Sequence, residues 1–357
     1  PETDLYAGLR HPTRPDVVLL TGGTDGGNSE VLLRAARDLV ASGWTGPVVV
    51  AGNVQAQAEV AEILAGVPHV LADNVVPRIG VLAPDSARGA IREMFLAHVI
   101  GGKHLSTRAE FTAMVRGATP DVVLTAVELL ANGLDDEHPG AGDVVVVDVG
   151  GATTDVHSVV DVDPVLRDGS SLASSGAEPA ELSREVVATT AVTRTVEGDL
   201  GMRWSAVATV EEADLPSLQD AALQRAGQPG FLPGTDAERD DDEAIARAAA
   251  GLALRRHAGR SKVVVGPDGR VVERTGKDLR EVDLLVGSGG ALRHGRAGIA
   301  DRVLGPCVGV DVEGGWQLPE RARVVVDADY VLAAVGLLAE RHPLAAYRLA
   351  RTLTDTP

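Results

Sequence analysis

The chain has 357 residues, more than one ordinary domain, and 45% of them are hydrophobic, so we expect two lobes with buried cores. Its formal net charge of −18 and its aromatic content of 3% argue against nucleic-acid binding, which needs local positive charge and stacking rings. The apolar runs are too short to span a bilayer, and the single cysteine, Cys307, excludes an internal disulfide and is typical of the reducing cytosol. We therefore expect a cytoplasmic protein with neither nucleic acid nor a membrane as partner, in which Cys307 is a small core residue rather than a catalytic thiol.

Strands and helices alternate in the first third of the chain. An apolar run at 16–20 predicts a buried strand, and a glycine-rich loop at 21–27 leads into a helix that Gly43 ends. A second strand at 47–51 and a helix at 55–64 complete a rhythm that favours a parallel βαβ unit. The loop at 21–27 precedes a helix N-terminus, where an anion could bind, but a connection that merely needs glycines is the favoured interpretation.

A polar, turn-rich stretch at 134–142 predicts the boundary between the lobes. Two helices are expected before it, at 85–102 and at 120–132, and a new strand follows it directly. We therefore expect the first lobe at 1–142 and the second at 143–357.

A helical insertion is expected at about 206–260, and its clearest element is a long helix between Thr235 and Gly259. The first turns of this helix carry six acidic residues, and its last turn carries three basic residues at 255–257. Acidic residues at the start and basic residues at the end both stabilise the helix dipole, so we interpret the two charge runs as structural.

The most informative stretch is residues 143–156, DVVVVDVGGATTDV. Its four valines predict a buried strand, Gly150 and Gly151 predict a turn, and the residues from Thr154 onward predict a second strand. Consecutive backbone N–H groups in such a turn can converge on an anion, and glycine lets phosphate oxygens approach closely. The alternative is a plain β-hairpin whose glycines need positive φ. A Walker loop is excluded here because Gly-Lys-Ser/Thr is absent, and a strand after the glycines argues against a dinucleotide site.

Carboxylates flank this turn. Asp148, at the end of the first strand, could hold Mg²⁺ through water, because Mg²⁺ prefers oxygen ligands and keeps part of its hydration. His157 shares a strand face with Asp155, and we interpret it as a packed strand histidine rather than a general base. The residues expected to bind phosphate are Gly150, Gly151, Ala152, Thr153 and Thr154, with the two threonine hydroxyls as additional donors.

A second glycine-rich turn, at 287–291, follows a predicted strand at 282–286. Such a turn lets a flat ring or a ribose lie against the backbone, whereas a tight strand–helix connection is the alternative. A late helix at 330–340 contains the pair Ala333 and Ala334 and, two residues later, Gly336. Small residues there allow a second helix to approach closely, although helix propensity alone also explains the alanines.

The order Asp-x-Gly-Gly-x-Thr-Thr-Asp at 148–155 and Gly-Ser-Gly-Gly at 287–290 resembles the actin, sugar-kinase and heat-shock chaperone superfamily. The resemblance implies an α/β, actin-like ATPase (ribonuclease H-like) fold of two lobes, in which the first motif holds phosphates and the second contacts adenosine. Members of that superfamily carry an earlier Asp-x-Gly-Ser/Thr phosphate loop, and no such motif precedes Asp16. We therefore expect the N-terminal phosphate-loop segment to be missing from this chain and its nucleotide contacts to be incomplete.

Further motifs narrow the resemblance. The segments at 21–28 (TGGTDGGN), 148–158 (DVGGATTDVHS), 195–203 (TVEGDLGMR) and 255–259 (RRHAG) are together similar to the glutamate mutase accessory proteins of the GlmL/MutL family. That family is unrelated to the mismatch-repair protein sharing the name. The likeness extends over residues 15–349. It implies an actin-like ATPase that binds ATP and Mg²⁺ and assembles or reactivates an adenosylcobalamin-dependent mutase.

The resemblance also implies roles for particular residues. Asp148 and Asp155 would be catalytic, Asp148 would also position Mg²⁺, and Glu197 would face the ribose or adenine unless it lies in a solvated turn. The other adenosine-binding residues that it implies are Gly287, Ser288, Gly289 and Gly290. Three functions stay open at this point: a reactivating or assembly ATPase, which we favour; a non-enzymatic mutase-binding protein with a vestigial nucleotide site; and a small-molecule kinase of the same fold. Formation of a homo-oligomer is also open.

Overall fold

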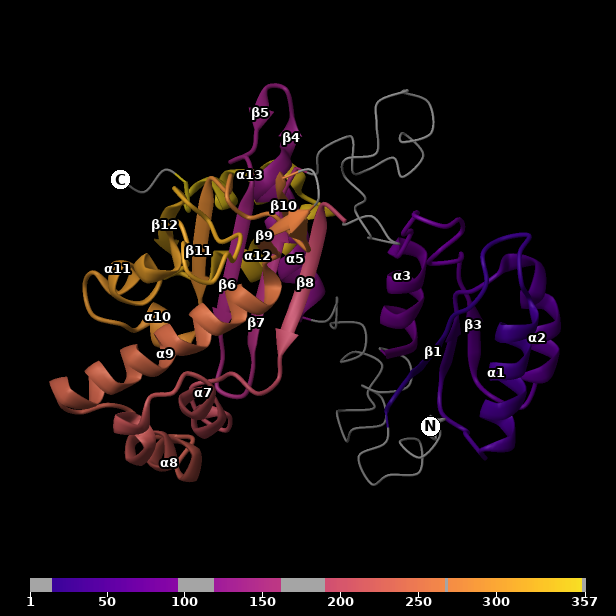
Figure 1. The fold of residues 1–357 in the computed structure, drawn as a ribbon, viewed down its shortest axis with the longest axis horizontal. Coiled ribbons are helices and arrows are strands. Elements are labelled where there is room, and N and C mark those ends of the chain that lie inside the picture. The colour runs from indigo at the N-terminus through magenta and orange to yellow at the C-terminus, as the bar shows by residue number, and fades with distance from the viewer. Residues whose placement is uncertain (1–14, 96–118, 162–189, 267–268, 355–357) are drawn as a thin grey trace. The chain divides into compact units, whose positions relative to one another are not determined.

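The computed structural model describes residues 15–95, 119–161, 190–266 and 269–354 (Figure 1). These residues form two compact units: the first contains 15–95, and the second contains the other three stretches. Within these stretches, no helix combines the length and the apolar character needed to cross a membrane.

The first unit is a small parallel sheet with helices on its faces. Its strands β1 (Val18–Leu20), β2 (Val48–Val50) and β3 (His69–Leu71) lie in that order. The helices are α1 (Glu30–Ala41), η2 (Val54–Ala56), α2 (Gln57–Ile63) and α3 (Asp85–Met94). The outer valines of β2 pack with α1 and α2, whereas Val49 packs with α3, because successive side chains of a strand face opposite sides. The βαβ prediction is confirmed, and β3 adds a strand that periodicity did not predict.

The glycine-rich loop after β1 is closed by its own hydrogen bonds. The Gly27 N–H donates to the Thr24 carbonyl oxygen (2.9 Å), and the Gly26 N–H donates to Gln55 Oε1 (2.7 Å). An anion at this helix N-terminus would need donors of this kind, and these two are already used. The structure therefore supports the interpretation of the loop as a connection.

The second unit is built on a five-stranded mixed sheet in the order β12-β11-β6-β7-β8. β6 (Val144–Val149), β7 (Thr154–Val159) and β8 (Val192–Glu197) form an antiparallel meander, and β11 (Leu284–Ser288) and β12 (Arg323–Val326) run parallel to β6. The predicted strand, glycine turn and strand are confirmed as the β6–β7 hairpin. Strands β8 and β12 extend the sheet at its two edges.

Helices pack on both faces of this sheet (Figure 1). One face carries α7 (Ala206–Glu212), α8 (Gln219–Gly227), α9 (Asp236–His257), α10 (Gly290–Arg293) and α11 (Ile299–Val303). The other carries α5 (Thr119–Asn132), α12 (Val331–Ala339) and α13 (Pro343–Arg351). The remaining short elements are β4 (Gly133–Asp135), β5 (His138–Pro139), η5 (Pro216–Leu218), β9 (Arg260–Gly266), β10 (Gly269–Thr275) and η6 (Gly305–Cys307).

The valines of β6 divide between two hydrophobic cores. Val145, Val147 and Val149 face the core on the α9 side, and Val144 and Val146 face the core on the α5 side. All five are fully buried, as the four-valine run predicts for a central strand with helices on both faces.

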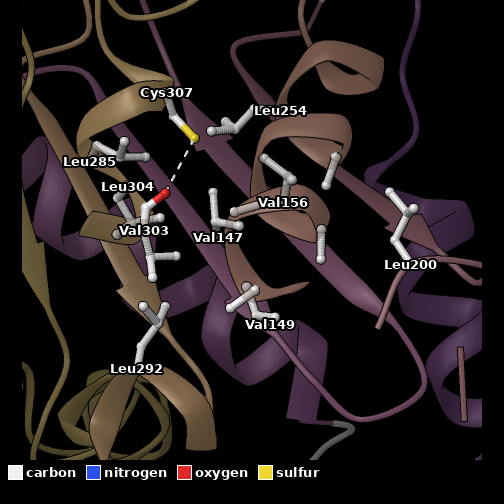
Figure 2. Packing of buried hydrophobic residues seen from close by; sticks show 14 of the residues in the cluster. Val147, Val149, Val156, Leu200, Leu254, Leu285, Leu292, Val303, Leu304 and Cys307 are labelled. Carbon is white, nitrogen blue, oxygen red and sulfur yellow. Dashed lines mark hydrogen bonds between the residues drawn. The ribbon is translucent and has the colours of Figure 1, made fainter. Parts of the chain in front are cut away.

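Cys307 lies in the core on the α9 side, where Figure 2 shows its thiol among buried leucines and valines. The Sγ atom is 4.0 Å from the Val303 carbonyl oxygen. Burial raises the pKa of the Cys307 thiol to about 11, so the thiolate that a nucleophile requires is scarce at neutral pH. Cys307 is therefore confirmed as a core residue.

The boundary between the units differs from the predicted one. α5 packs on α12, α13 and the sheet, so the chain divides before residue 119 rather than after residue 142. The polar stretch at 134–142 contains the small β4–β5 hairpin of the second unit. Turn-forming residues mark a hairpin as readily as a boundary between lobes, which explains the misplaced prediction. The predicted helix at 85–102 is present as α3 up to Met94, and its part from residue 96 lies outside the described residues.

α5 and α12 approach each other closely at Gly336. A Cβ atom at this position would overlap the carbonyl oxygen of Val122 on α5. The predicted role of a small residue in bringing two helices together is therefore confirmed, and the partner helix is α5.

The predicted helix between Thr235 and Gly259 is confirmed as α9, which begins with a capping box. Thr235 Oγ1 accepts the Glu238 N–H (3.3 Å), and the Glu238 carboxylate accepts the Thr235 N–H (2.9 Å). Asp242 and Glu243, in the same acidic run, are buried and paired with arginines of other segments. The dipole interpretation therefore accounts for only part of this run.

Candidate phosphate-binding site

Three parallel strands of the second unit end at the same edge of the sheet. Asp148, near the end of β6, lies beside Ser288, its register partner on β11. Asp327 directly follows β12, and its N–H donates to the Gly287 carbonyl oxygen (2.8 Å). The carboxyl ends of parallel strands are where open α/β sheets commonly bind ligands. The structure therefore brings the two predicted glycine motifs, 140 residues apart, to one edge.

In the turn between β6 and β7 the backbone carbonyl oxygens accept hydrogen bonds, whereas most of the backbone N–H groups donate none to the described residues. The Gly150 N–H donates to the Thr153 carbonyl oxygen (2.9 Å). The carbonyl oxygens of Gly150 and Gly151 accept backbone N–H groups of residues 202 and 203 (2.9 and 2.8 Å), and that of Ala152 accepts the hydroxyl of residue 205 (2.5 Å). Among the described residues, nothing accepts a hydrogen bond from the N–H groups of residues 151, 152 and 153. Three consecutive N–H donors are the arrangement expected of an anion-binding nest.

The two glycines of this turn are needed for close approach rather than for unusual backbone angles. Neither Gly150 nor Gly151 has positive φ. A Cβ atom at residue 151 would lie 2.9 Å from Cζ3 of Trp204, and one at residue 150 would lie 2.8 Å from the Thr153 carbonyl oxygen. The alternative of a hairpin whose glycines require positive φ is therefore wrong for these residues.

The two predicted carboxylates sit in different environments. Asp148 and Asp155 are register partners across the hairpin. Asp155 is held by Arg194, whose Nη2 and Nε donate to Oδ1 (2.7 and 3.0 Å), and it accepts the Thr153 hydroxyl (3.3 Å). Asp148 forms no ion pair with any described residue, and burial raises its pKa, with a further contribution from the negative charge of Asp155. A hydrogen bond from Ser288 acts in the opposite direction.

These surroundings decide what Asp148 could hold. A partly buried carboxylate close to a second carboxylate and without a basic partner is stabilised by a nearby cation, so its chemistry fits a Mg²⁺ ion. Among the described residues, no group of three or more His, Cys, Asp or Glu side chains is arranged to ligate a metal directly. Such an ion would therefore take its other ligands from water and from phosphate oxygens.

The second glycine motif forms the β11–α10 connection. Gly287 and Ser288 end the strand, Gly289 has φ +105°, and Gly290 begins the helix. A Cβ atom at residue 289 would overlap the carbonyl oxygen of Val149 and lie 3.1 Å from Asp148 Oδ1. A tight strand–helix turn, the alternative interpretation, is thus present, and it lies directly against the end of β6.

Two of the predicted site residues are occupied elsewhere. The Thr154 hydroxyl is fully buried and donates to the Leu200 carbonyl oxygen (3.0 Å), so the expectation that it adds a donor for phosphate is wrong. Glu197 ends β8 and accepts Arg256 Nη1 (2.8 Å), so it is not in a solvated turn. Strand β8 is three strands away from β11, about 14 Å at the usual strand spacing. The structure therefore does not bring Glu197 together with the residues at 287–290.

Three residues at this edge were not predicted from the sequence. Asp327 is buried and accepts the N–H groups of Val331 and Leu332 (2.8 and 3.1 Å) at the start of α12, and burial raises its pKa. Tyr330 has φ +55°, a strained conformation for a non-glycine residue, and Arg293 lies over its ring at 4.5 Å from the centroid. An aspartate directly after a run of three valines was the available signal, since Asp148 has the same context.

Two buried histidines flank the hairpin without joining the site. His157 is 1% exposed, and burial lowers its pKa to about 4. His257 forms hydrogen bonds with hydroxyl groups at both ring nitrogens, Ser158 (2.8 Å) and Thr195 (2.9 Å); in the neutral ring one nitrogen donates and the other accepts. Burial lowers the pKa of His257 to about 3. Both rings are neutral at physiological pH, and His157 is confirmed as a packed strand histidine.

The fold and the site together define a mixed α/β protein of two units. Its second unit carries a glycine turn whose N–H groups at 151–153 have no acceptor among the described residues, beside an aspartate that forms no ion pair with those residues. Residues 9–353 match the family model described as MutL protein. Protein MutL of Clostridium tetanomorphum is 36% identical over 348 residues, which cover 94% of this chain and 72% of that protein. The chain therefore belongs to the MutL protein family, as its motifs indicated.

Proposed function

We propose that this protein is an ATP-binding accessory protein that assembles or reactivates an adenosylcobalamin-dependent mutase such as glutamate mutase. Membership of the MutL family supports the link to a mutase. The observation that carries the nucleotide part is the β6–β7 turn, in which three consecutive N–H groups are unused by the described residues while every carbonyl is occupied. The mixed sheet with its β6–β7 hairpin supports the actin-like, ribonuclease H-like fold that the motifs imply.

In this proposal the two glycine motifs share one nucleotide. The phosphates bind the N–H groups of the turn at 151–153, and the nucleoside lies against the backbone at 287–290. Asp148 holds Mg²⁺ through water, and the bound ion would supply positive charge to the phosphate oxygens. The close contact of Gly289 with the end of β6 supports this arrangement, because it leaves no side chain between the motifs.

One observation favours a second candidate, a mutase-binding protein whose nucleotide site binds without hydrolysing. Arg194 already neutralises Asp155, the second residue proposed to be catalytic. Oδ1 of Asp155 already accepts two guanidinium hydrogen bonds and its Oδ2 accepts the Thr153 hydroxyl, which leaves fewer acceptor positions for an attacking water. Binding and hydrolysis must therefore be measured separately.

The test uses the whole chain, ATP, ADP and the adenosylcobalamin-dependent mutase of the same genome. We expect Mg·ATP to bind in calorimetry and to raise the melting temperature by mass action, and the affinity for the mutase to differ between ATP and ADP. Asp148→Asn is compared with Asp143→Asn, which removes a carboxylate at the other end of the same strand, and only the first should weaken Mg·ATP binding. No ATP binding by the unmodified chain would refute the nucleotide proposal, and no complex with the mutase in any state would refute the partner. Phosphorylation of a small metabolite would indicate a kinase instead.

A further inference from the structure

Helix α9 carries two adjacent buried carboxylates, Asp242 and Glu243, which are 9% and 7% exposed. Neighbouring residues on a helix point about 100° apart, so the two side chains reach different segments of the chain. Asp242 pairs with Arg203 and Arg225, whereas Glu243 pairs with two other arginines that follow α10. The proposed function makes no use of either carboxylate.

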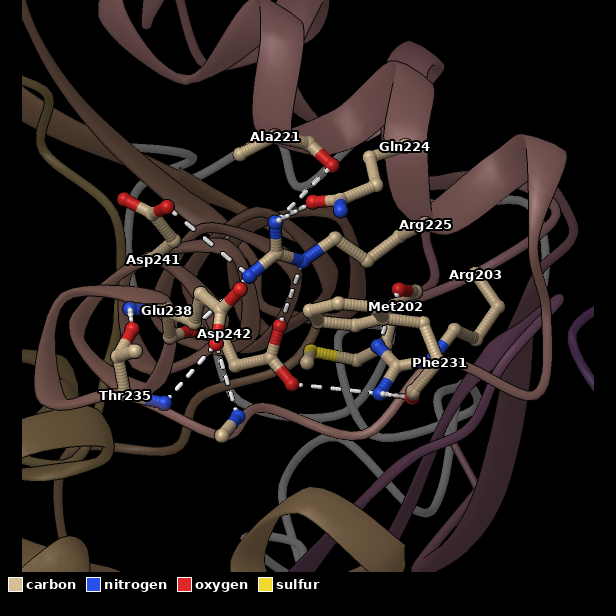
Figure 3. Close-up of polar contacts among 11 residues, drawn as sticks. Met202, Arg203, Ala221, Gln224, Arg225, Phe231, Thr235, Glu238, Asp241 and Asp242 are labelled. Atoms are coloured by element: carbon tan, nitrogen blue, oxygen red, sulfur yellow. Dashed lines mark hydrogen bonds and ion pairs between the residues drawn. The ribbon is translucent and has the colours of Figure 1, made fainter.

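Asp242 is linked through one residue, Arg203, to the β6–β7 turn at 150–153, the proposed phosphate site that we call the phosphate turn. Its Oδ2 accepts Arg203 Nη2 (3.2 Å), and its Oδ1 accepts Nε of the fully buried Arg225 (2.8 Å), as Figure 3 shows. The backbone N–H of Arg203 donates to the Gly151 carbonyl oxygen (2.8 Å). Arg203 therefore joins the turn by its main chain and α9 by its side chain.

Glu243 is linked to the second glycine motif less directly, through ion pairs and the packing of α11. Its Oε2 accepts Arg302 Nε (2.6 Å), and its Oε1 accepts Arg296 Nε (2.9 Å). These arginines lie in and directly before α11, which leads to Leu304. A Cβ atom at Gly287 would lie 2.5 Å from Leu304 Cδ1, so the end of α11 packs directly on the glycine motif. The two arginines also lower the pKa of Glu243 to about 2, which keeps it ionised.

We propose that Asp242 and Glu243 are positioning residues for the two halves of the nucleotide site: Asp242 holds the phosphate turn, and Glu243 holds the segment at 287–290. The inference rests on the proposed function and adds which residues outside the site hold the two motifs in place. The β6–β11 pairing sets the spacing of the two motifs. Because both carboxylates project from one helix, α9 braces the two attached segments from outside the site. Loss of one carboxylate loosens the side of one segment that it braces and leaves the other segment in place.

The test measures which part of the ligand loses affinity. Asp242→Asn, Glu243→Gln and Asp236→Asn are titrated with Mg·ATP, Mg·tripolyphosphate and adenosine. Asp236 is the matched control, an exposed carboxylate on the same helix whose one ion pair among the described residues is with the nearby Arg239. We expect Asp242→Asn to weaken the affinity for ATP and for tripolyphosphate by about tenfold, the effect of one charge-assisted hydrogen bond. The affinity for adenosine should stay unchanged. We expect Glu243→Gln to weaken the affinity for ATP and for adenosine by a similar factor and to leave the affinity for tripolyphosphate unchanged.

A purely structural role predicts a different pattern. Equal losses for all three ligands in both variants, or no difference from Asp236→Asn, would overturn the inference while ATP binding by the unmodified chain keeps the proposed function. If the unmodified chain binds neither ATP nor tripolyphosphate, the proposed function fails and the inference fails with it. Should a carboxylate variant not fold, Arg203→Lys and Arg302→Lys replace the two, because each keeps the charge and loses the guanidinium geometry. They must reproduce the same selective losses.

Discussion

Replacing Gly336 by alanine tests the close packing of α12 on α5. A Cβ atom there would lie 2.7 Å from the carbonyl carbon and 2.8 Å from Cγ1 of Val122, besides overlapping its oxygen. Carbon atoms in contact stay about 3.5 Å apart or more, so the helices must separate by roughly 0.7 Å or more at this point. The helices cannot separate freely, because Leu332 and Val335 of α12 are buried in the same core.

The expected magnitude follows from two opposing effects. Overpacking a well-packed core costs about 1–3 kcal/mol, and Gly→Ala within a helix recovers about 1 kcal/mol of backbone entropy. Because the clash here involves backbone rather than the end of a flexible side chain, we expect the upper part of that range and a net loss of about 1–2 kcal/mol.

Gly251→Ala is the matched control for this change. Gly251 lies in α9, and a Cβ atom at this position would meet nothing within 4 Å. The same substitution should therefore stabilise the chain by roughly 0.5–1 kcal/mol.

Thermal and urea unfolding of both variants, followed by circular dichroism, gives the sign of each effect. The chain contains two units and is not assumed to unfold in one step, so we compare midpoints of the transition to which the second unit contributes. A midpoint raised by Gly336→Ala, as by Gly251→Ala, would falsify the described contact between α5 and α12.

Three further predictions concern the site and its buried groups. If the protein hydrolyses ATP, Asp148→Asn should reduce the rate of hydrolysis by about one to several orders of magnitude, and an unchanged rate would contradict the metal role. The melting temperature at pH 7 should not fall, because the substitution removes a partly buried carboxylate whose pKa is raised by burial. The pKa values of His157 and His257 are lowered to about 4 and 3, whereas unfolded histidine titrates near 6.5. Their stabilisation, on the order of 3 kcal/mol each, is therefore complete above pH 6.5 and is lost as the pH falls towards 4 for His157 and towards 3 for His257. Equal urea midpoints at pH 7.5 and 4.5 would contradict the burial of the two rings. Cys307, with a thiol pKa of about 11, should react with a thiol reagent only when the chain unfolds, and rapid labelling of the native protein would refute its place in the core.

The sequence by itself determined the elements whose signals are local. Four consecutive valines ending at Asp148 and a glycine pair specify the β6–β7 hairpin, since a buried central strand needs apolar residues on both faces. Thr235 with Glu238 three residues later specifies the start of α9 through the capping box. These predictions held because the atoms that stabilise each feature are close together in the chain.

Only the tertiary structure decided which residues share an edge and what each side chain touches. The sequence placed Thr154 and Glu197 in the site by their position in the motif, but the Thr154 hydroxyl faces Leu200 and Glu197 pairs with Arg256. Composition also placed α5 with the first lobe, whereas its contacts with α12 put it in the second unit.

Asp242, Glu243 and Asp327 show the same limit. Asp242 and Glu243 lie in an acidic run that is typical of a solvated helix face, and each is buried because arginines of other segments pair with it. Asp327 is buried where its N–H donates to the carbonyl oxygen of Gly287 on the neighbouring strand. Burial and ion pairing depend on contacts across tens of residues, and the side-chain periodicity of a single segment carries no information about the segment that will cover it.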